Sequence, residues 1–168
     1  DRATGGGNVS PMILERLSRE PYRLTMRRGS SLIGTVPDAV QVGPKVCLIN
    51  KYSASDGDLF PWGFRALGLG KLIGTRTWGG IIGISGPLPY MDGTDIRVPF
   101  FTSYDPKTGN WIIENHGVDP DILIDNDPIK EWNGEDQQLD RAIEEVMKQL
   151  KERKPLAPVP APRDWSHK

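Results

Sequence analysis

Residues 46–76 have the sequence VCLINKYSASDGDLFPWGFRALGLGKLIGTR, and this stretch decides the fold. Residues 46–50 form a short apolar run between turn signals, a pattern typical of a buried strand. The Ser- and Asp-rich turn of residues 53–58 leads into residues 59–67, which end at glycines and predict a helix. Residues 72–75 are again short and apolar and predict a second strand. The order strand, helix, strand indicates a β-α-β unit, and hence an α/β fold with a mostly parallel sheet.

The segments before this unit predict a helix, a strand and a loop. Asn8 or Ser10 can cap a helix that has Pro11 in its first turn. Residues 22–28 mix basic and apolar side chains and predict a strand. Residues 29–45 contain Gly, Pro and Ser at short intervals, which predicts a loop.

The segments after the unit predict strands, a helix and a tail. Residues 78–85 hold three glycines among strand-forming residues, which marks a bulge or the close approach of another backbone. Asp92-Gly93 predicts a hairpin, and residues 122–124 predict a short strand. Apolar side chains at helical spacing predict an amphipathic C-terminal helix over residues 136–153, which closes the core or packs on a neighbouring subunit. Closely spaced prolines then predict an extended tail over residues 154–168.

The composition fits one domain of a globular protein, which we place at residues 1–153. The chain has 168 residues, of which 37% are hydrophobic and 26% charged, and its net charge is -1. This balance provides no polycationic surface for nucleic acid, and no apolar run approaches the ~20 residues that span a bilayer. Because the chain begins at Asp1 without a Met, we expect a piece of a longer polypeptide, which leaves localisation open.

No metal site and no cofactor are predicted. Cys47 is the only cysteine, which excludes an internal disulfide and a thiolate zinc site, and we expect it to be buried in a strand. A single cysteine favours a reducing cytosol, although an exported protein without disulfides has the same composition. Residues 68–71 lack the Ser or Thr that completes a phosphate-binding loop. The aspartates between residues 119 and 127 lack the spacing of a calcium loop.

Ser55 is the first candidate for chemistry. It follows the predicted buried strand where a helix begins, and backbone N–H groups at that place are unpaired while the helix dipole is positive. A nucleophile there has a ready site for a developing oxyanion. The alternative is structural, because Ser53, Ser55 or Asp58 can simply cap the helix.

The run Gly5-Gly6-Gly7 is the second candidate, since glycines before a helix let backbone amides approach an anion closely. One amide from this run and the amide of Asp56 could together form a two-donor oxyanion hole. The alternative is a flexible start to the chain.

Glu114 is the third candidate and follows the apolar residues 111–113, at the end of an expected strand. A partly buried carboxylate at such a place can orient or stabilise another catalytic group, although an ordinary strand-end Glu is the alternative. His116 could serve as a base, but a His in a Gly- and Pro-containing turn is commonly an exposed loop residue. His167 lies in the tail, where we expect no role.

Four segments, in this order, carry a resemblance to a known family. They are Gly5–Ser10, Asn50–Asp58, Gly68–Gly80 and Glu114–Asp121. Together they resemble the C-terminal catalytic domain of tricorn-type serine proteases, relatives of the C-terminal processing peptidases of family S41. The resemblance covers residues 1–150 approximately, and the long segment 68–80 is its most specific part.

The resemblance implies a ClpP/crotonase-like fold and a serine peptidase. It implies that Ser55 is the nucleophile and that Glu114 is the distal acid of a Ser-His-Ser-Glu tetrad. It also implies that the amides of Gly7 and Asp56 form the oxyanion hole.

The resemblance further implies a substrate cleft along the strand that follows Trp78. Gly79 and Gly80 would line this cleft, and Ile84 would lie near the P1 pocket. A peptide or an unfolded protein would be the substrate, and strand addition would suit the glycines.

The general-base His and its partner Ser come from an earlier domain in this family, and we find no counterpart in this sequence. A serine hydroxyl is a poor nucleophile until a base removes its proton. We therefore expect an upstream domain to carry the His, and this chain alone to be nearly inactive. A homo-oligomer is left open. The family's acidic residue after the first helix, which favours basic P1 side chains, has no counterpart in residues 22–26, so a basic preference is not predicted.

Two alternative functions stay open. The first is a non-catalytic peptide-binding module that keeps the cleft but lacks the base. The second is a crotonase-type acyl-CoA enzyme, because that fold shares the paired-amide oxyanion hole, although the serine-centred motif argues against it.

Overall fold

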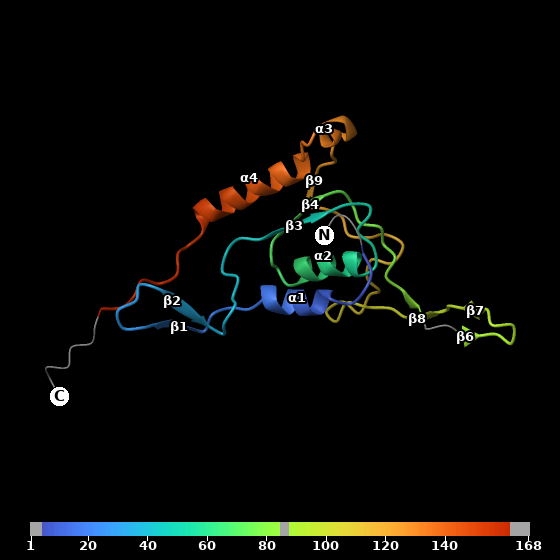
Figure 1. Ribbon diagram of the computed structural model, residues 1–168, viewed down its shortest axis with the longest axis horizontal. Helices are drawn as coiled ribbons and strands as arrows, with labels where there is room; N and C mark the ends of the chain where they lie inside the picture. The colour runs from blue at the N-terminus through green and yellow to red at the C-terminus, as the bar shows by residue number, and fades with distance from the viewer. Residues whose placement is uncertain (1–4, 85–87, 162–168) are drawn as a thin grey trace.

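A three-stranded parallel sheet forms the centre of the computed structural model, which describes residues 5–84 and 88–161 (Figure 1). Its strands are β3 (Val46–Ile49), β4 (Lys71–Gly74) and β9 (Ile122–Leu123), in the order β3-β4-β9. The helix α2 (Asp56–Ala66) connects β3 to β4. The α/β class and the predicted β-α-β unit are therefore confirmed.

The core lies between this sheet and the helices below it in Figure 1. Ile49 and Leu72 are fully buried on β3 and β4, and they cluster with Phe64 of α2. The helix α1 (Ser10–Leu17) packs on α2 where Gly63 leaves room, since a Cβ there would collide with the side chain of Leu14. Burying a side chain of this size stabilises the fold by roughly 1.5–3 kcal/mol.

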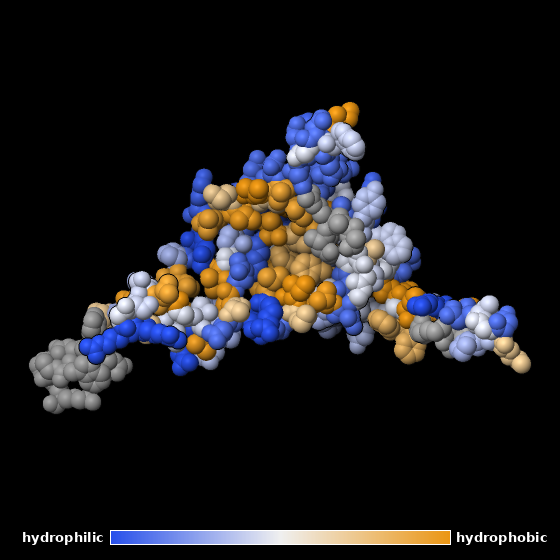
Figure 2. Space-filling model, viewed as in Figure 1, coloured by the Kyte–Doolittle hydropathy of each residue, from blue (hydrophilic) through white to orange (hydrophobic). Residues whose placement is uncertain are grey.

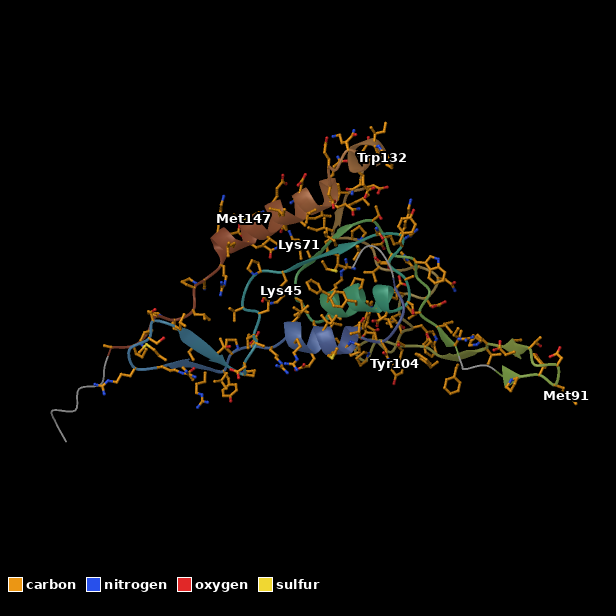
Figure 3. All side chains as sticks on the ribbon, viewed as in Figure 1. Lys45, Lys71, Met91, Tyr104, Trp132 and Met147 are labelled. Carbon is orange, nitrogen blue, oxygen red and sulfur yellow. The ribbon has the colours of Figure 1, made fainter. Side chains whose placement is uncertain are left out.

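The helix α4 (Gln137–Glu152) covers the opposite face of the sheet, which confirms the predicted C-terminal helix. Asp136 caps it by accepting a hydrogen bond from the amide of Leu139 at 3.0 Å. Lys71 on β4, which Figure 3 labels below α4, pairs with Glu145 of that helix at 2.8 Å between Nζ and Oε1 and connects the helix to the sheet.

The apolar face of α4 covers the core only in part. Ala142 is buried, whereas Ile143 and Met147 remain about half exposed. These side chains line a hollow of about 620 Å³ together with residues of β3 and α2. Figure 2 shows the apolar side chains gathered along α4 and over the centre of the molecule, between α4 and α1.

A hairpin of β1 (Arg23–Met26) and β2 (Ile33–Val36) confirms the first predicted strand and corrects the loop predicted over residues 29–45. The chain reverses at Gly29, whose φ is +75°. None of the residues of β2 is buried, and its sequence Ile-Gly-Thr-Val does not alternate between apolar and polar positions. The pairing with β1, rather than a pattern within the segment, makes it a strand.

Four short strands extend from the other side of the core (Figure 1). They form the antiparallel pairs β5 (Gly83–Ile84) with β8 (Pro99–Phe101) and β6 (Leu88–Pro89) with β7 (Asp95–Ile96). The hairpin at Asp92-Gly93 is confirmed, with the amide of Tyr90 donating to the carbonyl of Thr94 at 2.8 Å. The strand expected over residues 78–85 is wrong for most of its length, because among residues 78–84 only Gly83–Ile84 pairs, while Ser85 lies outside the described residues.

The remaining described segments are short. The helix α3 (Pro128–Trp132) was not predicted, and five residues are too few to show a helical period. Residues 154–161 of the expected tail are exposed and contain no helix or strand, while His167 lies outside the described residues. None of the helices in the described parts of the chain has the length and hydropathy of a membrane span.

Candidate active site

Ser55 lies on a sharp turn between the end of β3 and the start of α2. It is half-buried, and its φ of +56° and ψ of -114° place a residue with a Cβ in an unfavourable backbone region. Its backbone N–H donates to Oδ2 of Asp58 at 2.8 Å, so Asp58 accepts as the third helical residue does in a capping box. A strained strand-to-helix turn of this kind is the setting in which serine nucleophiles are presented.

The glycine run passes directly beside this turn. The amide of Gly6 donates to the carbonyl of Ala54 at 3.1 Å. A Cβ on Gly5 would lie 2.7 Å from the nitrogen of Ala54, so no larger residue fits there. Gly6 and Gly7 have φ values of +99° and +90°, which only glycine adopts readily. The structure therefore brings the second candidate segment to the first.

Two backbone amides stand without acceptors at this junction. Among residues 5–84 and 88–161, neither the N–H of Gly7 nor that of Asp56 donates a hydrogen bond. Asp56 is the first residue of α2, so its N–H has no partner within the helix. Unpaired donors of this kind are what a developing oxyanion requires.

The carboxylate of Asp56 holds the glycine run from the other side. It is buried, and its Oδ2 accepts hydrogen bonds from the amides of Val9 and Ser10, both at 3.0 Å. The prediction that Asn8 or Ser10 caps α1 is therefore wrong, because α2 packs on α1 and supplies the acceptor from Asp56. The same residue thus offers an amide at the junction and anchors the chain that follows Gly7.

Asp58 connects the Ser55 turn to the segment after Trp78. Its Oδ1 accepts from the amide of Gly79 at 2.7 Å, and its Oδ2 accepts from the amide of Gly80 at 3.2 Å. The amide of Trp78 donates to the carbonyl of Ser53 at 2.9 Å, next to these bonds. The side chain of Trp78 is largely exposed, at 64%.

Glu114 lies in a turn and not at the end of a strand, which corrects the expectation for residues 111–113. Only Trp111 of that run pairs, as an isolated bridge to Tyr104. Oε2 of Glu114 accepts from the amides of Ile81 at 2.7 Å and Ile82 at 3.0 Å. Four successive amides, at residues 79–82, therefore donate to the two carboxylates of Asp58 and Glu114.

The glycines after Trp78 pack closely against other parts of the chain, and at Gly79 the neighbouring atoms belong to the backbone. A Cβ on Gly79 would lie 2.7 Å from the carbonyl carbon of His116, and one on Gly80 would lie 2.6 Å from the ring of Trp78. The predicted close approach of another backbone is confirmed for Gly79, where that backbone is the turn after Glu114. Since the four amides already have acceptors, a peptide cannot pair with them by strand addition.

Two further candidates lie at the margin of this bond network. Ile84 is 55% exposed on β5, beyond the bonded amides. His116 is exposed, and its Nε2 lies 3.3 Å from Oδ2 of Asp119. None of the hydrogen bonds between described residues joins His116 to Ser55.

Two hollows flank the network. One of about 390 Å³ adjoins the glycine run and has a mixed lining, with the apolar side chains of Val9, Ile13 and Phe60 beside the polar ones of Ser10 and Asp56. The other, of about 590 Å³, is lined by Glu114 together with Ile82 and Trp111. Among the described residues, no group of His, Cys, Asp and Glu is arranged to hold a metal ion.

The sequence did not predict the hydrogen bonds that the side chains of Asp56 and Asp58 accept. A Ser followed three residues later by an acidic residue is a capping-box pattern, which signals the bond from Ser55 to Asp58. The bonds to Gly79, Gly80 and Val9 have no local signal, because they depend on the packing of distant segments.

Comparison with known proteins places the chain among peptidases. The sequence profile of peptidase family S41 matches residues 2–124. Tricorn protease of Thermoplasma volcanium is 40% identical over 153 residues, which are 91% of this chain and 15% of that protein. Tricorn protease homolog 1 of Streptomyces coelicolor is 38% identical over 151 residues, which are 90% of this chain and 14% of that protein.

The crystal structure of the tricorn protease has the same fold, with a TM-score of 0.78 and 38% identity over 87% of this chain and 14% of that chain. This chain therefore spans only 14–15% of the length of these relatives. The profile covers more than half of the chain, and the described fold agrees with it. The chain belongs to peptidase family S41, and its similarity within that family is to tricorn-type proteases.

Proposed function

We propose that this chain is the nucleophile-bearing part of a serine peptidase that hydrolyses peptide bonds. One observation carries the proposal: Ser55 occupies a strained turn at the start of α2, beside two amides, of Gly7 and Asp56, that have no acceptor among the described residues. Membership of a peptidase family and the similarity to tricorn-type proteases support the same reaction.

In the proposed reaction, Oγ of Ser55 attacks the scissile carbonyl carbon and passes its proton to a base. The carbonyl oxygen becomes an oxyanion and accepts hydrogen bonds from the amides of Gly7 and Asp56. Collapse of this intermediate expels the protonated amine and leaves an acyl ester on Ser55, which water then hydrolyses. Removing one such donor costs roughly 10²–10³ in kcat.

The general base is proposed to be a His supplied by a segment outside residues 1–168. Such a base contributes typically 10²–10⁴-fold. The position of His116 supports this choice, because it is exposed at a turn and none of the hydrogen bonds between described residues joins it to Ser55.

Glu114 is proposed as the distal acid that orients this base through a bridging Ser. Its Oε2 is fixed by two amides, while its Oε1 has no hydrogen-bond partner among the residues that the structure describes. The hollow of about 590 Å³ beside it gives side chains from another segment room to enter.

The substrate is proposed to be a peptide that lies along the exposed side chains of Trp78 and Ile84. Gly79 and Gly80 shape this path by admitting the neighbouring turn and ring, not by pairing with the peptide.

Labelling with a fluorophosphonate tests the proposal in the native full-length protein. We expect one labelled residue, Ser55, identified by mass spectrometry, and no labelling after Ser55→Ala. Ser18→Ala is the matched control and should be labelled like the wild type, because Ser18 is exposed and its hydroxyl bonds only to the carbonyl of Glu15 among the described residues. An unlabelled wild-type protein would contradict the proposal and favour a peptide-binding module.

A further inference from the structure

Asp58 is a fully buried carboxylate whose partners are backbone amides. It accepts three N–H donors, from Ser55, Gly79 and Gly80, at 2.8, 2.7 and 3.2 Å. Among the described residues no Lys, Arg or His forms an ion pair with it. A buried carboxylate is costly unless it is hydrogen-bonded, so these three donors account for its place in the interior.

The three donors belong to two separate segments. Ser55 is the residue with the strained backbone, and such strain persists only where the surroundings over-determine the conformation. Gly79 and Gly80 begin the row of four amides that ends on Glu114. An unbroken path of hydrogen bonds and backbone therefore runs from Ser55 through Asp58 to Glu114.

We propose that Asp58 is a positioning residue for Ser55. Its two carboxylate oxygens hold the Ser55 backbone and the Gly79-Gly80 segment in one fixed relation. They thereby set the place of Oγ of Ser55 against the oxyanion donors on one side and Glu114 on the other. This inference rests on the proposed function, since positioning matters only if Ser55 reacts.

Because both carboxylate oxygens of Asp58 accept hydrogen bonds, the effect of Asp58→Asn can be predicted. An Asn side chain has one acceptor oxygen, and its NH₂ group would face an amide N–H, donor against donor. At least one of the three bonds is then lost, although the side chain keeps its size. A shift of about 1 Å in a reacting group can cost about 10²-fold in rate, which is the loss we expect.

Asp127 provides the matched control. It also accepts two backbone amides at the start of a helix, from Ile129 at 2.8 Å and Lys130 at 3.2 Å, but both reach the same oxygen, Oδ1. An Asn keeps that single acceptor, so Asp127→Asn should be labelled at the wild-type rate. Ile73→Ala, which removes a buried side chain of β4, controls for a general loss of stability.

The experiment measures the rate constant for fluorophosphonate labelling of Ser55 in the full-length protein, with peptide hydrolysis alongside. Asp58→Asn should slow labelling by about 10²-fold and lower kcat by a larger factor than it raises KM, because the variant misplaces the reacting group Ser55 while Asp58 itself does not touch the substrate. Backbone hydrogen exchange should rise at Ser55, Gly79 and Gly80. A folded Ile73→Ala variant should keep the wild-type labelling rate.

The outcomes separate the two proposals. If the wild type is labelled and Asp58→Asn is labelled at the same rate, the positioning role is overturned and the proposed function is not. The same holds if Ile73→Ala, at matched stability, loses as much of its labelling rate as Asp58→Asn. Absence of labelling in the wild type would instead contradict the proposed function.

Discussion

Gly79→Ala tests how closely the turn after Glu114 presses on the segment beside Ser55. Gly79 has a φ of +88°, and a Cβ there would lie 2.7 Å from the carbonyl carbon of His116 and 2.8 Å from its nitrogen. Both atoms belong to the backbone, so no side-chain rotation relieves the collision. The variant must move the turn or the segment.

The magnitude follows from two separable costs. A residue with a Cβ in the left-handed region costs about 1–2 kcal/mol. Gly93 isolates this cost, because its φ is +83° and a Cβ there would meet no atom within 4 Å. At Gly79 the displacement also breaks the bond from its amide to Asp58, and an unpaired buried donor costs about 1–3 kcal/mol. We therefore expect Gly79→Ala to lower the free energy of unfolding by about 1–3 kcal/mol more than Gly93→Ala.

Urea denaturation of the wild type and both variants measures this difference. In a domain of this size each kcal/mol also lowers Tm by roughly 2–4 °C, which gives an independent readout. Equal losses in the two variants would refute the reasoning, because the cost at Gly79 would then be conformational only.

Three further predictions concern titration, reactivity and the glycine run. Hydrogen bonds to Lys71 and Gln149 lower the pKa of Glu145 from 4.5 to about 2, so its contribution to stability is full above pH 4.5 and is lost as the pH falls toward 2. Urea unfolding at a series of pH values should show that Glu145→Gln is less stable than the wild type at pH 7. The difference in free energy of unfolding between the two proteins should shrink between pH 4.5 and 2. A difference that does not change with pH would contradict this. Burial raises the pKa of the Cys47 thiol to about 11, so iodoacetamide at pH 7 should alkylate the native protein far more slowly than the urea-unfolded chain, and equal rates would show that the thiol is accessible. Asp56→Ala removes the oxygen that anchors the chain after Gly7 and should slow labelling of Ser55 by roughly 10²-fold. Asp56→Asn should slow labelling less, because a single oxygen accepts both amides. A slower labelling rate in Asp56→Asn than in Asp56→Ala would be inconsistent with the observed bonds.

The elements that the sequence predicted correctly are those whose signal is local. Residues 46–76 combine two buried apolar runs with a helix between glycine and Ser/Asp signals, and each part is decided by its own residues. The helix α4 has a period of apolar side chains long enough to be unambiguous, and Asp92-Gly93 fits its turn. In these segments local preference and tertiary structure agree.

The features that the sequence did not predict depend on contacts between distant segments. β2 is a strand because β1 lies beside it, and the partners of the Glu114 carboxylate are amides 32 and 33 residues away. In the candidate site, too, the features with a local signal were predicted and those that depend on distant contacts were not. Ser55 and the glycine run could be proposed from their positions, whereas the contacts of Asp58 with Gly79 and Gly80 appear only in the folded chain.

The amides of residues 79–82, which donate to Asp58 and Glu114, also limit how this sequence can change in evolution. Asp58 lies 21 residues from Gly79, yet the two positions are linked: Asp58 supplies an oxygen to the Gly79 N–H, and the turn after Glu114 leaves no room for a Cβ on Gly79. Across homologues we expect residues 58, 79 and 80 to be inherited as one unit. A recombination point placed between α2 and Trp78 would separate the halves of that unit, and such chimaeras should fold poorly unless both parents carry the same three residues.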